Sequence, residues 1–80
     1  MATAILRLPA VKSASGLSRT TLYHRMSQGQ WPKAVRLGVR AVGWPSDEVA
    51  AVNAARIAGK SDSEIRALVA KLEAGRKSAA

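Results

Sequence analysis

The spacing of apolar residues along the 80-residue chain predicts four helices. In each of them apolar side chains recur three or four residues apart, which places those side chains on one helical face. A glycine follows each stretch, where a residue with a left-handed conformation ends a helix. The predicted helices cover residues 8–16, 18–28, 46–58 and 61–75.

Serine residues mark the starts of three of these helices. Ser18 and Ser46 each precede a helical stretch, and a serine hydroxyl in that position accepts a hydrogen bond from an amide of the first turn. Ser61 and Glu64 have the spacing of a capping box, in which each side chain bonds the other residue's amide. Gly75 is expected to end the last helix.

Between the second and third helices the pattern changes to the alternation of a strand. Residues 33–37 alternate between two faces, residues 38–40 make a turn, and residues 41–44 return, which predicts a β-hairpin. Trp31 and Trp44 flank this hairpin and are predicted to plug its core. The alternative, stacking of the indoles on unpaired bases, requires exposed rings.

The order of these elements predicts a mainly α fold, a winged helix-turn-helix. It consists of a two-helix unit, a two-stranded β-hairpin as the wing and a third helix, followed by a C-terminal helix. Residues 1–60 are expected to form this winged helix-turn-helix domain. Residues 61–75 are expected to form an amphipathic helix that packs on the domain or mediates self-association, and residues 76–80 a tail.

The charge of the chain is unevenly distributed. Lysine and arginine outnumber aspartate and glutamate 13 to 5, which gives a formal net charge of +8. Residues 1–46 contain seven of the cations and no carboxylate, whereas residues 47–80 contain six cations and all five carboxylates. A positive half without carboxylates predicts a surface that meets phosphates. The alternative is a chance bias on a solvated surface.

Composition excludes several classes of site. The chain has no cysteine and a single histidine, so it cannot form a disulfide, a thiolate nucleophile or a multi-histidine zinc site, and no metal or cofactor is expected. No nucleophile with an adjacent base is visible, so an enzyme is not expected. The sequence lacks an apolar run of about 20 residues and a secretory signal, which predicts a cytoplasmic protein with no membrane partner.

Four blocks of this sequence resemble the AlpA family of prophage regulators. They are LRLPAV at residues 6–11, GLSRTTLY at 16–23, GQWPKAVRLG at 29–38 and VGWPSDEV at 42–49. The resemblance implies a winged helix related to MerR-like proteins and excisionases, and a small DNA-binding regulator of transcription or a recombination directionality factor. Ala34 and Val52 depart from the family, which commonly has proline and tryptophan there.

The residues expected to contact DNA lie on helix 18–28 and on the hairpin. If Leu22 and Met26 face the core, the other side chains of this helix surround its free surface, whose first turn enters the major groove. Alternatives are that Tyr23 packs on the hairpin, that His24 is solvated, and that the hairpin arginines protect an edge strand. The predicted contacts are Ser18, Arg19, Thr20, Tyr23, His24, Arg25, Lys33, Arg36 and Arg40.

The function predicted from the sequence is specific binding of duplex DNA by a prophage or mobile-element transcription regulator. Helix 18–28 is expected in the major groove and hairpin 33–44 is expected to act as a wing. Further expected partners are a second copy on repeated sites, an integrase or RNA polymerase. The alternatives are an excisionase-type factor that bends DNA for an integrase, an RNA-binding basic domain and a protein-interaction adaptor.

Overall fold

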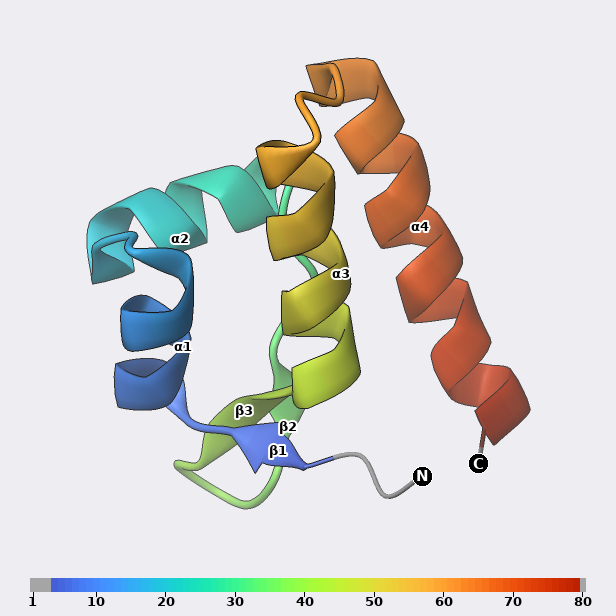
Figure 1. Ribbon diagram of the computed structural model, residues 1–80. Coiled ribbons are helices and arrows are strands. Elements are labelled where there is room, and N and C mark those ends of the chain that lie inside the picture. The colour runs from blue at the N-terminus through green and yellow to red at the C-terminus, as the bar shows by residue number, and fades with distance from the viewer. Residues whose placement is uncertain (1–3, 80) are drawn as a thin grey trace.

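The computed structural model describes residues 4–79 and contains four helices and three short strands (Figure 1). The helices are α1 (Leu8–Ser15), α2 (Arg19–Ser27), α3 (Ser46–Ile57) and α4 (Asp62–Ala79). The strands are β1 (Ile5–Leu6), β2 (Val35–Arg36) and β3 (Val42–Pro45). The predicted helices and hairpin are confirmed in order, and the fold is a mainly helical winged helix-turn-helix.

A tight turn joins α1 to α2. Gly16 ends α1 with a φ of 71°, in the left-handed region that glycine adopts without strain. Ser18 then caps α2 as predicted, because its hydroxyl oxygen accepts a hydrogen bond of 3.2 Å from the amide of Thr21. Leu22 is buried and anchors α2 to the core.

The sheet has three antiparallel strands in the order β1-β3-β2, which corrects the prediction of a two-stranded unit. Val35 pairs with Gly43 in the hairpin, and on the other side of β3 Leu6 pairs with Trp44. β1 contains only two residues and lies about forty positions from its partner. Alternation over two residues is too short to mark a strand, so β1 could not be predicted from the sequence pattern.

The start of α3 also differs from the prediction. Ser46 is the first helical residue rather than a cap, and its hydroxyl makes no capping hydrogen bond. Instead the Ser46 hydroxyl accepts a 3.2 Å hydrogen bond from the amide of Ala4, and the Ser46 amide donates to the Ala4 carbonyl at 2.8 Å. The serine therefore joins the N-terminal strand to the start of α3.

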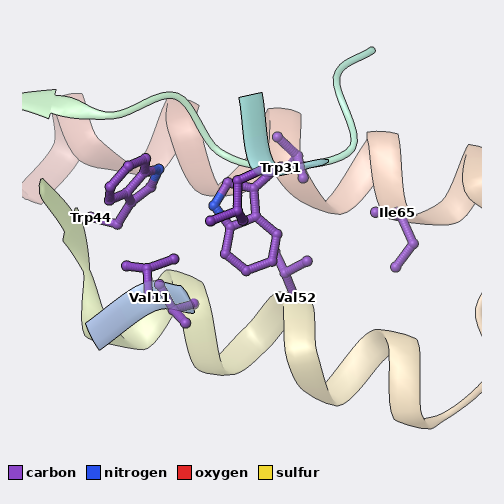
Figure 2. Close-up of a cluster of buried hydrophobic side chains, with 8 residues drawn as sticks. Val11, Trp31, Trp44, Val52 and Ile65 are labelled. Carbon is purple, nitrogen blue, oxygen red and sulfur yellow. The ribbon is translucent and has the colours of Figure 1, made fainter. Parts of the chain in front are cut away.

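Eight buried apolar side chains form the core, and both tryptophans belong to it as predicted (Figure 2). These side chains come from α1, α2, β3, α3, α4 and the segment after α2. They are Val11, Leu22, Trp31, Trp44, Val49, Val52, Ile65 and Val69. Every helix thus contributes to one core, including the C-terminal helix.

α4 is longer than predicted. The capping box is confirmed, because the Glu64 amide donates to the Ser61 hydroxyl at 3.3 Å and the Ser61 amide donates to the Glu64 carboxylate at 3.4 Å. The expected end at Gly75 is wrong, since Gly75 has no positive φ and the helix continues to Ala79. Arg76, the predicted start of the tail, is therefore helical. Its side chain is bound to α3 and to the segment before β2.

None of the helices within residues 4–79 combines the length and the apolar character needed to cross a bilayer.

Candidate nucleic-acid interface

The free surface of α2 carries polar side chains around its first two turns. Leu22 is buried and Met26 is partly buried, so Arg19, Thr20 and Tyr23 are turned outward and are exposed. The guanidinium carbon of Arg19 lies 5.6 Å from the centre of the Tyr23 ring, a cation–π distance. Tyr23 itself is 40% exposed, so its ring supports Arg19 at the surface.

Ser18 sits at the N-terminus of α2 and its hydroxyl is already engaged. Besides accepting from the Thr21 amide, this hydroxyl donates a 2.9 Å hydrogen bond to the Thr21 hydroxyl. The helix N-terminus also presents backbone N–H groups and the positive end of the helix dipole, which favour an anion. The structure thus brings Ser18, Arg19 and Thr20 together at one end of α2.

The remaining predicted contacts of this region lie toward the other end of α2. His24 is exposed in the last turn, and Arg25 is half-buried. The Arg25 carbonyl accepts hydrogen bonds from the amides of Gln28 and Gln30, which turns the chain out of the helix. Lys33 is exposed but its backbone lies against the C-terminal half of α4, so it does not join the first turn of α2.

The hairpin holds a second group of exposed cations. Arg36 ends β2 and Arg40 lies in the bend that leads to β3. The bend is closed by hydrogen bonds from the amides of Leu37 and Gly38 to the Ala41 carbonyl, at 2.8 and 3.3 Å. Val39, between the two arginines, is 91% exposed. The hairpin therefore projects two guanidinium groups on a short, hydrogen-bonded turn.

α1 separates the two groups. It starts directly after β1, which pairs with β3, and ends at the turn that leads into α2 (Figure 1). Its eight residues span about 12 Å at the rise of an α-helix. Arg7, which precedes the first residue of α1, and Lys12, within α1, are both exposed, although neither was among the predicted contacts. The block of residues without carboxylates was the signal that marked them.

Ion pairs in the described residues are confined to the second half of the chain. They join Arg56 to Asp62 at 3.1 Å, Lys60 to Glu64 at 3.7 Å, and Arg76 to Glu48. None of the seven cations of residues 1–46 has a carboxylate partner within the part of the chain that the structure describes. Carboxylates therefore do not neutralise the positive potential of the first half, which favours binding of an external anion.

Hydrogen bonds shift two pKa values in the second half. The Ser61 amide, followed by the Ser61 hydroxyl, lowers the pKa of the exposed Glu64 carboxyl. Hydrogen bonds to Glu48 raise the pKa of Arg76, whose guanidinium donates to that buried carboxylate at 2.9 Å through Nε. Both groups serve the fold and lie outside the predicted contact surface.

A two-helix unit, a hairpin and a third helix define the class as a winged helix-turn-helix, with an uncompensated positive half. The family described as "Prophage CP4-57 regulatory protein (AlpA)" matches residues 4–56, about two thirds of the sequence. The chain belongs to this family. The match ends within α3, so α4 lies outside it.

Two relatives are similar to the same part of the chain. "Uncharacterized protein ORF88" of Enterobacteria phage P4 is 46% identical over 55 residues, which are 69% of this chain and 62% of the relative. "DNA-binding transcriptional activator AlpA" of Escherichia coli K12 is 39% identical over 51 residues, which cover 56% of this chain and 73% of the relative. The match thus spans less than two thirds of the phage P4 relative. No solved structure matches the chain significantly.

Proposed function

We propose that the protein regulates transcription in a prophage or mobile element by binding specific sites in duplex DNA. The observation that carries this proposal is the group of seven cations in residues 1–46 that have no carboxylate partner among the described residues. Six of them lie on or directly beside the helix-turn-helix and the hairpin, and the seventh, Lys33, lies in the segment that joins α2 to β2. The name of the Escherichia coli relative, a DNA-binding transcriptional activator, supports the same function.

In this proposal α2 reads bases in the major groove. Arg19 at its first turn donates two hydrogen bonds to one guanine, the commonest specific contact of an arginine. The Tyr23 ring beneath the guanidinium restricts its orientation, which favours this bidentate geometry. Thr20 meets a thymine methyl group or a phosphate, and the amides beside Ser18 bind a phosphate. His24 contacts a phosphate or a base edge farther along the groove.

The hairpin acts on the DNA backbone. Arg36 and Arg40 are exposed on a hydrogen-bonded turn, and a guanidinium forks onto two phosphate oxygens or enters a narrow minor groove. Arg25 and Lys33 add phosphate contacts that carry no sequence information. This division of roles predicts that α2 determines which site is bound and that the wing determines how tightly any duplex is bound.

Binding assays with two arginine variants test this division. We expect Arg19→Ala to lose about 1 to 3 kcal/mol on the DNA upstream of the protein's own gene and to relax sequence preference. We expect Arg36→Ala to weaken specific and random duplexes alike. Lys71→Ala is the matched control, since it removes an exposed cation of α4. Fluorescence anisotropy on both duplexes measures all three variants.

The salt dependence gives an independent check of the same proposal. Neutralising about four to six phosphates gives a slope of about −4 to −5 in a plot of log K against log salt concentration.

Equal losses of Arg19→Ala and Arg36→Ala on both duplexes would refute the assigned roles. Absence of any preference over random duplex at physiological salt would refute the proposed function itself.

Recombination and RNA binding are separate outcomes of the same assays. Strong bending of the bound duplex, together with a requirement for the protein in integrase-dependent excision, would identify a directionality factor. Preference for structured RNA over duplex DNA would identify an RNA-binding domain. A protein adaptor that docks through the apolar stripe of α4 has less support, because Ile65 and Val69 of this stripe are buried in the core.

A further inference from the structure

Three polar side chains of α4 bind the backbone at both ends of the segment that joins α2 to β2. Arg66 Nε donates a 3.0 Å hydrogen bond to the carbonyl of Gln28, the C-terminal cap of α2. Glu73 Oε2 accepts a 2.8 Å hydrogen bond from the amide of Lys33. Arg76 Nη2 donates to the carbonyl of the same lysine at 2.8 Å. We call these three side chains the clamp.

The helix spacing explains why one element reaches both ends of the segment. Arg66 and Glu73 are seven residues apart, which is two helical turns, so they lie one above the other on α4. Arg76 follows one turn later and is fixed by its ion pair with Glu48, which is only 4% exposed. Trp31, within the segment, is buried in the same core as Ile65 of α4 (Figure 2).

The position of α2 relative to the hairpin depends on this segment. Within residues 4–79, no hydrogen bond or ion pair joins a residue of α2 directly to the hairpin 35–45. Besides the core that Leu22 and Trp44 share, α2 is linked to the hairpin by the clamped segment on one side and by α1 with β1 on the other. A segment held at Gln28, its first residue, and at Lys33, near its end, transmits a defined orientation from one element to the other.

We propose that α4 is a positioning element that sets the orientation of α2 relative to the wing, with Arg66 and Glu73 as positioning residues. The consequence for DNA rests on the proposed function, because it is the wing and α2 together that would span adjacent grooves. α4 lies outside the residues that match the family. The clamp would thus adapt a shared DNA-binding unit to the groove spacing of this protein's own sites.

A distance measurement between α2 and the wing tests the clamp without DNA. The chain has no cysteine, so Ser27→Cys and Val39→Cys introduce two spin labels at exposed positions. We expect Glu73→Ala to broaden the label-to-label distance distribution measured by double electron–electron resonance. Glu73→Gln should restore it, since the amide oxygen still accepts from the Lys33 amide. Lys71→Ala, on the same helix, should leave it unchanged.

Arg66→Met provides a second route if Glu73→Ala does not fold. This variant keeps an apolar stem but removes the hydrogen bond to Gln28, and it should broaden the same distribution. Circular dichroism of each variant confirms that the helices are present. An unchanged distribution in folded Glu73→Ala, or in Arg66→Met where the first does not fold, would overturn the proposal.

A binding cycle then tests the consequence for DNA. We expect the loss in DNA affinity caused by Arg36→Ala to be at least about threefold smaller in the Glu73→Ala background than in the native chain. The reason is that Glu73→Ala no longer holds the wing in a fixed orientation relative to α2. Additive losses would overturn this consequence. If the distance distribution broadens but neither background binds duplex DNA, the proposed function fails and the clamp stands. If specific binding is intact and the distribution is unchanged, the clamp alone fails.

Discussion

Two buried tryptophans show how one hydrogen bond distinguishes residues that otherwise look alike. Trp31 and Trp44 are both almost fully buried in the same core. The Trp44 Nε1–H donates a 2.9 Å hydrogen bond to the carbonyl of Pro32, whereas the Trp31 Nε1–H has no partner among the described residues. A buried donor without a partner offsets part of the benefit of burying the ring.

Replacement of each tryptophan by phenylalanine measures this difference. Both substitutions leave a similar cavity, but Trp44→Phe also leaves the Pro32 carbonyl without its donor, whereas Trp31→Phe removes an unsatisfied group. We expect Trp44→Phe to lower the free energy of unfolding by about 1 to 3 kcal/mol more than Trp31→Phe. Urea denaturation, monitored by circular dichroism, measures the free energy of unfolding of both variants. Equal losses in the two variants would contradict the predicted difference.

At the scale of elements, the sequence predicted what depends on neighbouring residues. Ser18, with Leu22 one turn on, carries a cap and an apolar face within a few positions, and both were confirmed. β1 depends on a partner about forty residues away, and Ser46 bonds Ala4 across the same distance. Gly75 looked like a helix end because nothing local shows that Arg76, directly after it, binds α3 and the segment before β2.

The close approach of β1 to the hairpin requires a glycine at position 43 of β3. A Cβ atom added at Gly43 would lie 2.5 Å from Ile5 Cγ2 and 2.9 Å from the Leu6 carbonyl oxygen. We expect Gly43→Ala to displace β1 and to lower the free energy of unfolding by about 1 to 3 kcal/mol. Gly38→Ala is the control, since its Cβ would meet only Ala41, at 3.9 Å. Thermal unfolding of the two variants gives the comparison, and equal midpoints would argue against this packing.

The capping box makes part of the stability of α4 depend on pH. Hydrogen bonds from Ser61 lower the pKa of Glu64 in the folded protein, so the charged carboxylate stabilises the fold above the ordinary pKa of 4.5. This contribution is lost as the pH falls through the lowered pKa. We expect the stability gap between the native chain and Glu64→Gln to be larger at pH 7 than at pH 3. Thermal unfolding at both pH values measures the gap, and a gap independent of pH would disprove the effect.

At the scale of the whole molecule, the uneven charge acquires a spatial meaning. In Figure 1 α4 lies on one side of α3, and α1 and α2 lie on the other. The carboxylates Glu48, Asp62 and Glu64 pair with cations of α3, α4 and the loop between them, which leaves the cations of residues 1–46 without carboxylate partners among the described residues. The sequence located this half, but the placement of Lys33 beside α4 depends on tertiary contacts that no local pattern encodes.

The same arrangement predicts that the first sixty residues do not fold alone. α4 supplies Ile65 and Val69 to the core and Arg76 to the buried carboxylate of Glu48. Loss of each large core side chain costs about 2 to 5 kcal/mol, and a small domain has a total stability of about 5 to 15 kcal/mol. A chain that ends at Lys60 should therefore lack a cooperative unfolding transition.

Fluorescence of Trp31 and Trp44 provides the measurement, because both indoles are buried only while the core is intact. We expect the shortened chain to show the red-shifted emission of solvated tryptophan without denaturant. The full chain with Ala67→Gln and Ala70→Gln is the control, since these substitutions change exposed positions of α4 and should leave the emission unchanged. Native emission and a cooperative transition in the shortened chain would mean that residues 1–60 form a core without α4.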